Sequence, residues 1–243
     1  MLKRLVRPFV PPPVLDAWRR YAAARIDRRF SGATPAEAFS AVYREKLWWS
    51  TGNTEYYSGS GSHEDAIVRP YLESVRAFVS EFPELAAAVD LGCGDFHVGS
   101  QLVASFRRFI AADVVPELIE RNARDFCHLR AAFRCVDIVN DELPGADVAF
   151  LRQVLQHLSN VQVAAVMPKL YQYRWLVVTE HLPSSLGFKP NRDKPMGPGI
   201  RQRFGSGLVL TAPPFNLRTV EQRELCAVVR GTGTIQTVAY RMT

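Results

Sequence analysis

Short apolar segments alternate with segments of helical periodicity through the middle of the chain. The apolar segments are 86–90, 109–113, 132–136, 146–151 and 175–179, and helical periodicity covers 98–106, 115–127 and 161–172. Strands separated by helices pair in parallel, because a right-handed crossover returns the chain to the same edge of the sheet. The alternation therefore predicts an α/β fold built on a doubly wound, mostly parallel sheet.

The C-terminal part breaks this alternation. Residues 224–230 and 234–242 are strand-like, and the Gly231-Thr232-Gly233 turn lies between them. Strands joined by so short a turn form an antiparallel hairpin, which we expect at the end of the sheet. Residues 183–214 are rich in Pro, Gly, Lys and Arg. Loops of that length inside compact domains are usually functional or disordered, and we assign this one to the substrate.

The N-terminal part is basic. Residues 1–30 hold eight basic and two acidic side chains, an excess of six that equals the net charge of +6 of the whole chain. Helical spacing over 14–30 and after Pro35, followed by a Ser- and Gly-rich loop over 50–62, predicts a helical extension. We divide the chain into this extension with its loop, 1–62, and an α/β domain, 63–243. The extension either contacts an anionic membrane or acidic glycan, or is a solvated helix face.

Composition excludes several classes of protein. The chain is 47% hydrophobic and 22% charged, which is enough apolar surface to form a core and excludes disorder. Its apolar runs are too short to cross a bilayer, and Pro11–Pro13 interrupt the stretch that a signal peptide would need. We therefore expect a cytoplasmic protein. The four cysteines form no CxxC pair, so no metal site is predicted, and the neutral chain beyond residue 30 argues against nucleic acid as a partner.

The strongest local signal is the segment VDLGCGDF at 89–96, in which a strand runs into a glycine turn. Glycine gives such a turn backbone angles closed to other residues and lets a ligand approach the main chain. The sixth position of the dinucleotide-binding fingerprint is His97 instead of Gly. Asp90 and Asp95 flank the turn and would repel a pyrophosphate. They suit a cationic ligand without phosphate, such as S-adenosylmethionine.

Two more carboxylates follow the next two predicted strands. Asp113 ends the second strand, where a carboxylate accepts hydrogen bonds from ribose hydroxyls. Asp137 and Ile138 follow the third strand and offer an acceptor for an adenine amino group beside an apolar surface. Each aspartate alone is more often a turn or helix-cap residue. Three carboxylates in register behind a glycine turn favour an adenosine-containing ligand.

These segments resemble the motifs of class I S-adenosylmethionine-dependent methyltransferases. The resemblance covers residues 86–180, with VDLGCGDF as the glycine motif, IAADVV as the ribose motif, CVDIV as the adenine motif and DVAFLRQVLQHLS after the fourth strand. The flanking segments resemble a bacterial subgroup associated with polysaccharide and surface-glycan biosynthesis. The resemblance implies a Rossmann-like sheet and methyl transfer to a small-molecule or glycan acceptor, foremost O-methylation of a sugar hydroxyl.

The resemblance also implies the cofactor contacts. Residues of the loop that would form a lid, of the glycine turn and of the strand ends are Tyr57, Gly59, Gly61, Asp90, Gly92, Cys93, Gly94, Phe96, Asp113, Val114, Asp137, Ile138, Arg152, Gln153 and Val154. The family usually has a third glycine where this chain has Phe96, whose ring we expect to cover the cofactor edge. Ser- and Gly-rich loops elsewhere are commonly linkers.

A hydroxyl acceptor needs a base, although alignment and desolvation do most of the work of methyl transfer. His157 follows the fourth strand and is the first choice, and Glu180 and His181 at the end of the fifth strand come next. A base at His157 would make the rate rise with pH through about 6 to 7. A structural contact is the alternative for each residue.

Two other functions stay open at this point. One is methylation of another small metabolite at nitrogen or oxygen. The other is a non-catalytic scaffold built on the cofactor-binding fold, which only Phe96 in place of Gly favours.

Overall fold

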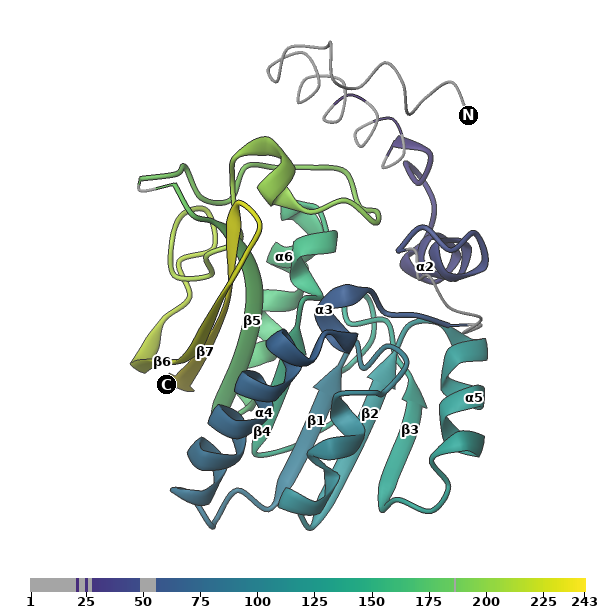
Figure 1. The fold of residues 1–243 in the computed structure, drawn as a ribbon, viewed down its shortest axis with the longest axis vertical. Coiled ribbons are helices and arrows are strands. Elements are labelled where there is room, and N and C mark those ends of the chain that lie inside the picture. Colours follow the sequence, from purple (N-terminus) through teal and green to yellow (C-terminus); the bar gives the residue numbers. More distant parts are fainter. Residues whose placement is uncertain (1–20, 22–24, 26–27, 49–55, 186) are drawn as a thin grey trace.

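The computed structural model describes residues 21, 25, 28–48, 56–185 and 187–243 (Figure 1). Most of the basic helix predicted over 14–30, and residues 50–55 of the predicted lid loop, lie outside this part. Among the helices that are described, none combines the length and the apolar character needed to cross a membrane.

A seven-stranded sheet in the order β3-β2-β1-β4-β5-β7-β6 forms the centre of the molecule. The parallel strands are β1 (Ala87–Leu91), β2 (Arg108–Asp113), β3 (Ala131–Cys135), β4 (Val148–Arg152) and β5 (Trp175–Pro183). The hairpin of β6 (Thr219–Arg230) and β7 (Gly233–Met242) is antiparallel, and β7 pairs with β5. The predicted doubly wound sheet and its C-terminal hairpin are confirmed.

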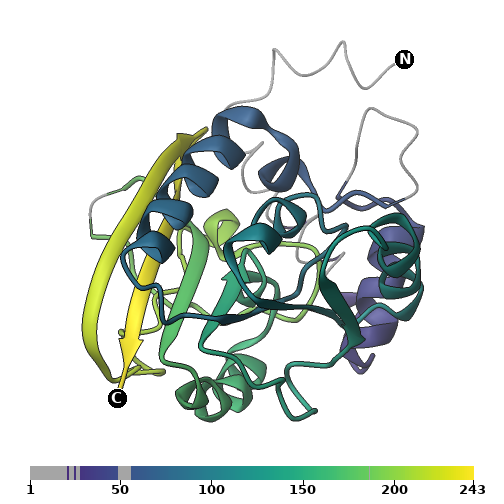
Figure 2. The same cartoon turned by 90° about the horizontal axis from the view of Figure 1, so that it is seen from below.

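The central strands β1, β2, β4 and β5 are buried on both faces, which explains why they are apolar runs without polar alternation, whereas the edge strands β3 and β6 are partly exposed. In β1, Val89 and Leu91 pack on one face and Ala88 on the other. The α4 helix (Asp65–Ser80) covers the Ala88 face, and α6 (Asn160–Val166) contributes to the core on the opposite face (Figures 1 and 2). Two shorter helices, α2 (Pro35–Arg44) and α5 (Pro116–Asp125), contact each other.

The helix predicted over 98–106 is replaced by two 3₁₀ turns, Gly99–Gln101 and Val103–Ser105. The side chains of Ser100 and Gln101 both donate to the carbonyl oxygen of His97. Such side chains compete with the backbone for its acceptors, which weakens an α-helix.

Two other predicted segments also differ from the structure. The segment 161–172 changes from α6 to a 3₁₀ helix at Met167–Gln172, where Pro168 lacks a backbone N–H. The loop predicted over 50–62 ends in a single helical turn, α3 (Ser60–His63).

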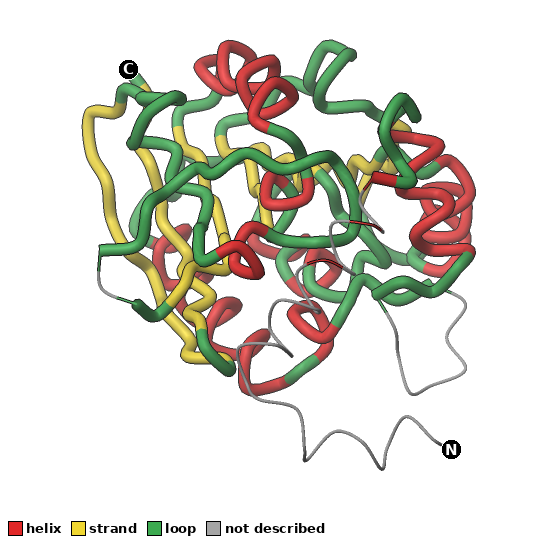
Figure 3. The backbone as a smooth tube through the Cα atoms, turned by 90° about the horizontal axis from the view of Figure 1, so that it is seen from above, coloured by secondary structure: helices red, strands yellow, loops and turns green. Residues whose placement is uncertain are grey.

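The long loop after β5 is packed against the domain (Figure 3). Asn191 is 5% exposed, and its amide nitrogen donates to the carbonyl oxygens of Val209, Ala212 and Pro213, while its amide oxygen accepts from the Val209 N–H. Arg201, also buried, donates to the carbonyl oxygens of residues 155, 156 and 158. Asn191 and Arg201 therefore hold the loop in place.

Replacing Asn191 tests how much these hydrogen bonds stabilise the loop. Asn191→Gly should lower the free energy of unfolding by about 2 kcal/mol, because buried carbonyl groups lose their donor. Glycine accepts the residue's positive φ of 56°, so backbone strain does not contribute. Urea unfolding measures the change. Asn216→Gly is the control, because Asn216 also has a positive φ, of 48°, but is exposed. Equal effects of the two variants would contradict this account.

Candidate functional site

A cavity of about 450 Å³ opens at the carboxyl ends of the parallel strands. Its wall includes all predicted cofactor contacts except two, namely Gly59, Gly61, Asp90, Gly92, Cys93, Gly94, Asp113, Val114, Asp137, Ile138, Arg152, Gln153 and Val154. The two exceptions are Tyr57 and Phe96. Of the predicted catalytic residues, His157 and His181 line the cavity and Glu180 does not.

The glycine turn has left-handed backbone angles at alternate positions. Gly92 has φ of 81° and Gly94 has φ of 57°. A Cβ atom on Gly92 would lie 2.4 Å from Cγ2 of Val154, and one on Gly94 would lie 2.3 Å from Oγ of Ser58. Glycine is therefore required both by the conformation and by the close approach of the protein's own side chains.

Phe96 continues this pattern with a φ of 61°. Its ring is fully buried in the core, with its centroid 5.0 Å from that of Phe133 and 5.2 Å from that of Phe126. The prediction that the ring covers the cofactor is therefore wrong. The backbone adopts the angle for which glycine is usual, and burial of the aromatic ring offsets a strain of about 1 to 3 kcal/mol.

Two buried side chains hold the turn in place. Asp113 accepts the N–H of Gly94 at 2.9 Å with Oδ2 and the N–H of Val115 at 3.1 Å with Oδ1. Asn122, on the buried face of α5, donates to the carbonyl oxygen of Gly94 at 2.7 Å. Burial raises the pKa of Asp113 in spite of these bonds. The contact of Asp113 with a ribose stays a prediction, and the role of Asn122 was missed.

Asp137 also forms local hydrogen bonds. Its Oδ1 accepts the N–H of Val139 at 2.9 Å, and its Oδ2 accepts from the side-chain amide of Asn140 at 2.7 Å. This is the turn role that a strand-end aspartate commonly has. Its contact with adenine stays a prediction.

Asp90 and Arg152 place opposite charges on the cavity wall. Burial raises the pKa of Asp90 to about 7, although the positive charge of Arg152 acts in the opposite direction. Arg152 donates to Oγ of Ser62 and to the carbonyl oxygen of Gly61, and it lies 4.9 Å above the ring of Tyr71. The cavity therefore presents a carboxyl that titrates near neutral pH beside a guanidinium.

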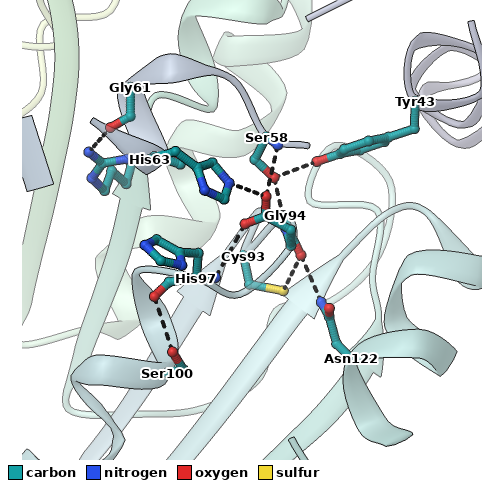
Figure 4. A network of polar contacts seen from close by, with 12 residues as sticks. Tyr43, Ser58, Gly61, His63, Cys93, Gly94, His97, Ser100 and Asn122 are labelled. Atoms are coloured by element: carbon teal, nitrogen blue, oxygen red, sulfur yellow. Dashed lines mark hydrogen bonds and ion pairs between the residues drawn. The ribbon is translucent and has the colours of Figure 1, made fainter. Parts of the chain in front are cut away.

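The loop before α4 is bonded to the glycine turn (Figure 4). The N–H of Ser58 donates to Oδ2 of Asp95 at 2.9 Å, and the N–H of Asp95 donates to Oγ of Ser58 at 2.8 Å. The ring of Tyr57 stacks on that of His63 at 4.6 Å and is not part of the cavity wall, so its cofactor contact stays a prediction. Ser58 and Asp95 line the cavity. Asp95 was expected beside a cationic ligand, whereas Ser58 was missed as a site residue; the Ser/Gly-rich loop that contains it was the available signal.

His157 is poorly suited to act as a base. Burial and the positive charge of Lys194 lower its pKa to about 3. Its Nδ1 lies 3.3 Å from the carbonyl oxygen of Gly197 and therefore carries the proton, while Nε2 lies 3.5 Å from the amide nitrogen of Gln156. An imidazole of this kind does not titrate between pH 6 and 7, so the expected rise of rate in that range is wrong for His157.

Glu180 and His181 are adjacent in β5 but have different surroundings. Glu180 is 5% exposed, and burial raises its pKa to about 8 against the opposing charge of Arg201. It is buried and is not part of the cavity wall, which argues against contact with an acceptor, and its catalytic role stays a prediction. His181 lines the cavity, burial lowers its pKa, and its Nε2 has no hydrogen-bond partner among the described residues.

Glu180 should make the protein less stable as the pH rises. Its folded-state pKa lies above its usual value of 4.5, so the folded protein retains the proton and loses stability between about pH 4.5 and 8. Glu180→Gln removes this penalty and should raise the free energy of unfolding at pH 9 by on the order of 1 to 4 kcal/mol, with little gain at pH 5. Urea unfolding at both pH values, with the exposed Glu73→Gln as control, measures it. An equal change at both pH values would contradict the assignment.

No protein-family model matches this chain, and no curated protein does. Solved structures do resemble it. The N-methyltransferase NodS from Bradyrhizobium japonicum WM9, with S-adenosyl-L-homocysteine, has a TM-score of 0.59 at 14% identity over 82% of this chain and 95% of that chain. The N-terminal domain of EvdMO1, with S-adenosyl-L-homocysteine and D-fucose present, has a TM-score of 0.54 at 15% identity over 84% and 97%.

A third structure is magnesium protoporphyrin IX methyltransferase (ChlM) from Synechocystis PCC 6803 with bound S-adenosylmethionine. Its TM-score is 0.51 at 16% identity, over 90% of this chain and 97% of that chain. At these identities the likeness concerns the arrangement of the backbone. The chain has the Rossmann-like fold of S-adenosylmethionine-dependent methyltransferases.

Proposed function

We propose that this protein transfers a methyl group from S-adenosylmethionine to a small-molecule or glycan acceptor, foremost to a sugar hydroxyl. The observation that carries the proposal is the presence of Asp90 and Arg152 together on the cavity wall. The methionyl group of S-adenosylmethionine bears an ammonium and a carboxylate, and neighbouring opposite charges are complementary to it. The sulfonium adds a positive charge, which the carboxylates of Asp95 and Asp113 favour.

The chain after the glycine turn argues against a dinucleotide. A pyrophosphate binds at the N-terminus of an α-helix, where N–H groups and the helix dipole attract it. The Gly99–Gln101 and Val103–Ser105 turns that follow here are three-residue 3₁₀ segments and supply no such dipole. A ligand without phosphate agrees better with this backbone.

The acceptor is proposed from the side chains beyond the cofactor contacts. The cavity is lined there by His157, His181, Gln156, Gln202 and Arg203, and no carboxylate from the described residues lies among them. A protonated amine would favour a carboxylate, whereas a sugar hydroxyl bonds well to amides and imidazoles. The presence of D-fucose in the EvdMO1 structure supports a sugar, and NodS is an N-methyltransferase, which keeps a nitrogen acceptor as the alternative.

The alternative of a non-catalytic scaffold rested only on Phe96 in place of glycine, and the conformation of Phe96 does not support it. Phe96 replaces the family's third glycine but keeps a left-handed backbone, and its ring points into the core. The cavity is therefore not obstructed by this substitution, and an active enzyme is the better proposal.

We assign the general base to His181 in place of His157. Burial lowers the pKa of both imidazoles, so each is neutral at pH 7. His157 is bonded to Gly197 on one nitrogen and lies near Gln156 on the other, whereas Nε2 of His181 has no partner among the described residues. The assignment rests on the place of His181 in the cavity wall, because its Nε2 is itself buried beside Gly233, where a Cβ atom would lie 2.6 Å from it.

Binding of S-adenosylmethionine should become tighter as Asp90 ionises. Because its pKa is raised to about 7, the carboxylate fraction increases about 15-fold between pH 5.5 and 7, and affinity for the ammonium should rise by about the same factor. Titration calorimetry measures this slope. Asp90→Asn should abolish it, and Asp125→Asn on α5, which is not among the residues that line the cavity, should keep it. Absence of binding by the wild type would overturn the proposed function.

Replacing His181 should affect turnover and not cofactor affinity. His181→Gln should lower the rate of S-adenosylhomocysteine formation by about 10² to 10⁴ with a sugar acceptor, found by mass-spectrometric screening of neutral and acidic glycosides. His157→Gln should keep the rate within about tenfold. A larger loss for His157→Gln than for His181→Gln would reverse the assignment, and binding without methylation of any acceptor would favour the scaffold.

A further inference from the structure

Residues 58–63, which we call the lid segment, form part of the cavity wall but have no apolar anchor. Gly59, Ser60, Gly61 and Ser62 line the cavity, and α3 buries none of its side chains. Segments with few buried apolar contacts open locally at low free energy. The closed position of the lid segment must therefore depend on polar contacts.

Asp95 supplies the central contact. Its carboxylate is 5% exposed, and Oδ2 accepts both the N–H of Ser58 and Nε2 of His63, the latter at 2.6 Å. Oδ1 accepts the N–H of His97 at 3.2 Å. A hydrogen bond to a buried carboxylate is stronger than one between neutral groups. The bonds from His63 and Ser58 lower the pKa of Asp95 although burial opposes them.

The ring of His63 is held in the orientation that this bond needs. It lies in a stack between Tyr57 and His97, with ring centroids 4.6 Å away on both sides and interplanar angles of 22° and 23°. Figure 4 shows the imidazole pointing from the lid segment toward the glycine turn. The stack restricts the rotamers of His63, so less entropy is lost when the bond forms.

Two arginines hold the rest of the lid segment. Arg152 donates to Gly61 and Ser62, and Arg230 in the hairpin donates to Ser60 and pairs with Glu64. These contacts are made to the backbone or to short hydroxyl side chains, or lie at the surface. The His63 bond is the side-chain contact that joins the lid segment to the buried carboxylate of Asp95, beside the backbone N–H of Ser58, which donates to the same oxygen.

We propose that His63 and Asp95 form a latch that keeps the lid segment closed over the cavity, and that this latch must break when a bound nucleoside is exchanged. Asp95 of the latch and the cavity-lining residues Gly92 and Gly94 belong to the same glycine turn. Asp95 is at most three residues from either glycine. Opening of the latch therefore exposes the same edge of the cavity that a nucleoside would occupy. The identity of the exchanged nucleoside rests on the proposed function. The latch itself rests only on contacts seen in the ligand-free protein.

Hydrogen exchange in the full-length, ligand-free protein tests the latch directly. In His63→Ala, amides of the lid segment should exchange about tenfold faster, while those of α4 (Asp65–Ser80) keep their wild-type rates. His63→Gln retains a donor to Asp95 and should be intermediate. The control is His128→Ala, since His128 is exposed and is not among the residues that line the cavity. Unchanged exchange in the lid segment, or equal acceleration in α4, would overturn the latch.

The rate at which S-adenosylhomocysteine is released tests whether the latch limits ligand exchange. Stopped-flow displacement followed by tryptophan fluorescence, with Trp48 in the cavity wall as reporter, should give a dissociation rate about tenfold higher in His63→Ala and in Asp95→Asn. The double variant should be no faster than the faster single one, because both remove the same bond. Faster exchange with unchanged release would refute the role in ligand exchange. A wild type that binds no S-adenosylhomocysteine would refute the proposed function, and the exchange experiment would still decide the latch.

Discussion

The carboxylate of Asp113 fixes the geometry on which the cavity depends. It accepts N–H groups from the glycine turn and from its own strand end, and so joins β1 to β2 at the edge where the cavity opens. Asn122 adds a bond from α5 to the carbonyl oxygen of Gly94. With the turn held on both its N–H and its C=O, the side chains of Asp90 and Asp95 are presented in fixed directions. Groups preorganised in this way lose little entropy when a ligand binds.

The sequence predicted the sheet well because its central strands are buried on both faces. Strands such as β1 and β2 are then continuous apolar runs, and the Gly231 turn marks the hairpin independently of any tertiary contact. The segment 98–106 was mistaken for a helix because its apolar spacing is helical, while the competition of Ser100 and Gln101 for the carbonyl of His97 depends on the local fold. Apolar periodicity reports burial and does not report which hydrogen bonds form.

The sequence places a candidate residue at the cavity where its position at a strand end determines this. It does not reveal the contacts that come from tertiary packing. His157 stands at the expected strand end, but the loop 184–218 returns over it, places Lys194 nearby and bonds Gly197 to its ring. No pattern within the segment 155–158 could reveal that contact. Glu180 and His181 are neighbours in sequence, and the alternation of a strand sends one into the protein interior and the other to the cavity.

Packing also explains why Phe96 can stand where the family usually has a third glycine. Three left-handed residues at positions 92, 94 and 96 coil the chain tightly, and Val154 and Ser58 fill the space that Cβ atoms would need at the first two. At the third position the side chain points into the aromatic cluster of Phe109, Phe126 and Phe133, where a Cβ and ring are accommodated. At positions 92 and 94, both the positive φ and the close contacts exclude a side chain. At position 96 only the positive φ favours glycine, because there is room for a side chain. A bulky residue can therefore replace glycine there while the wall of the cavity keeps its shape.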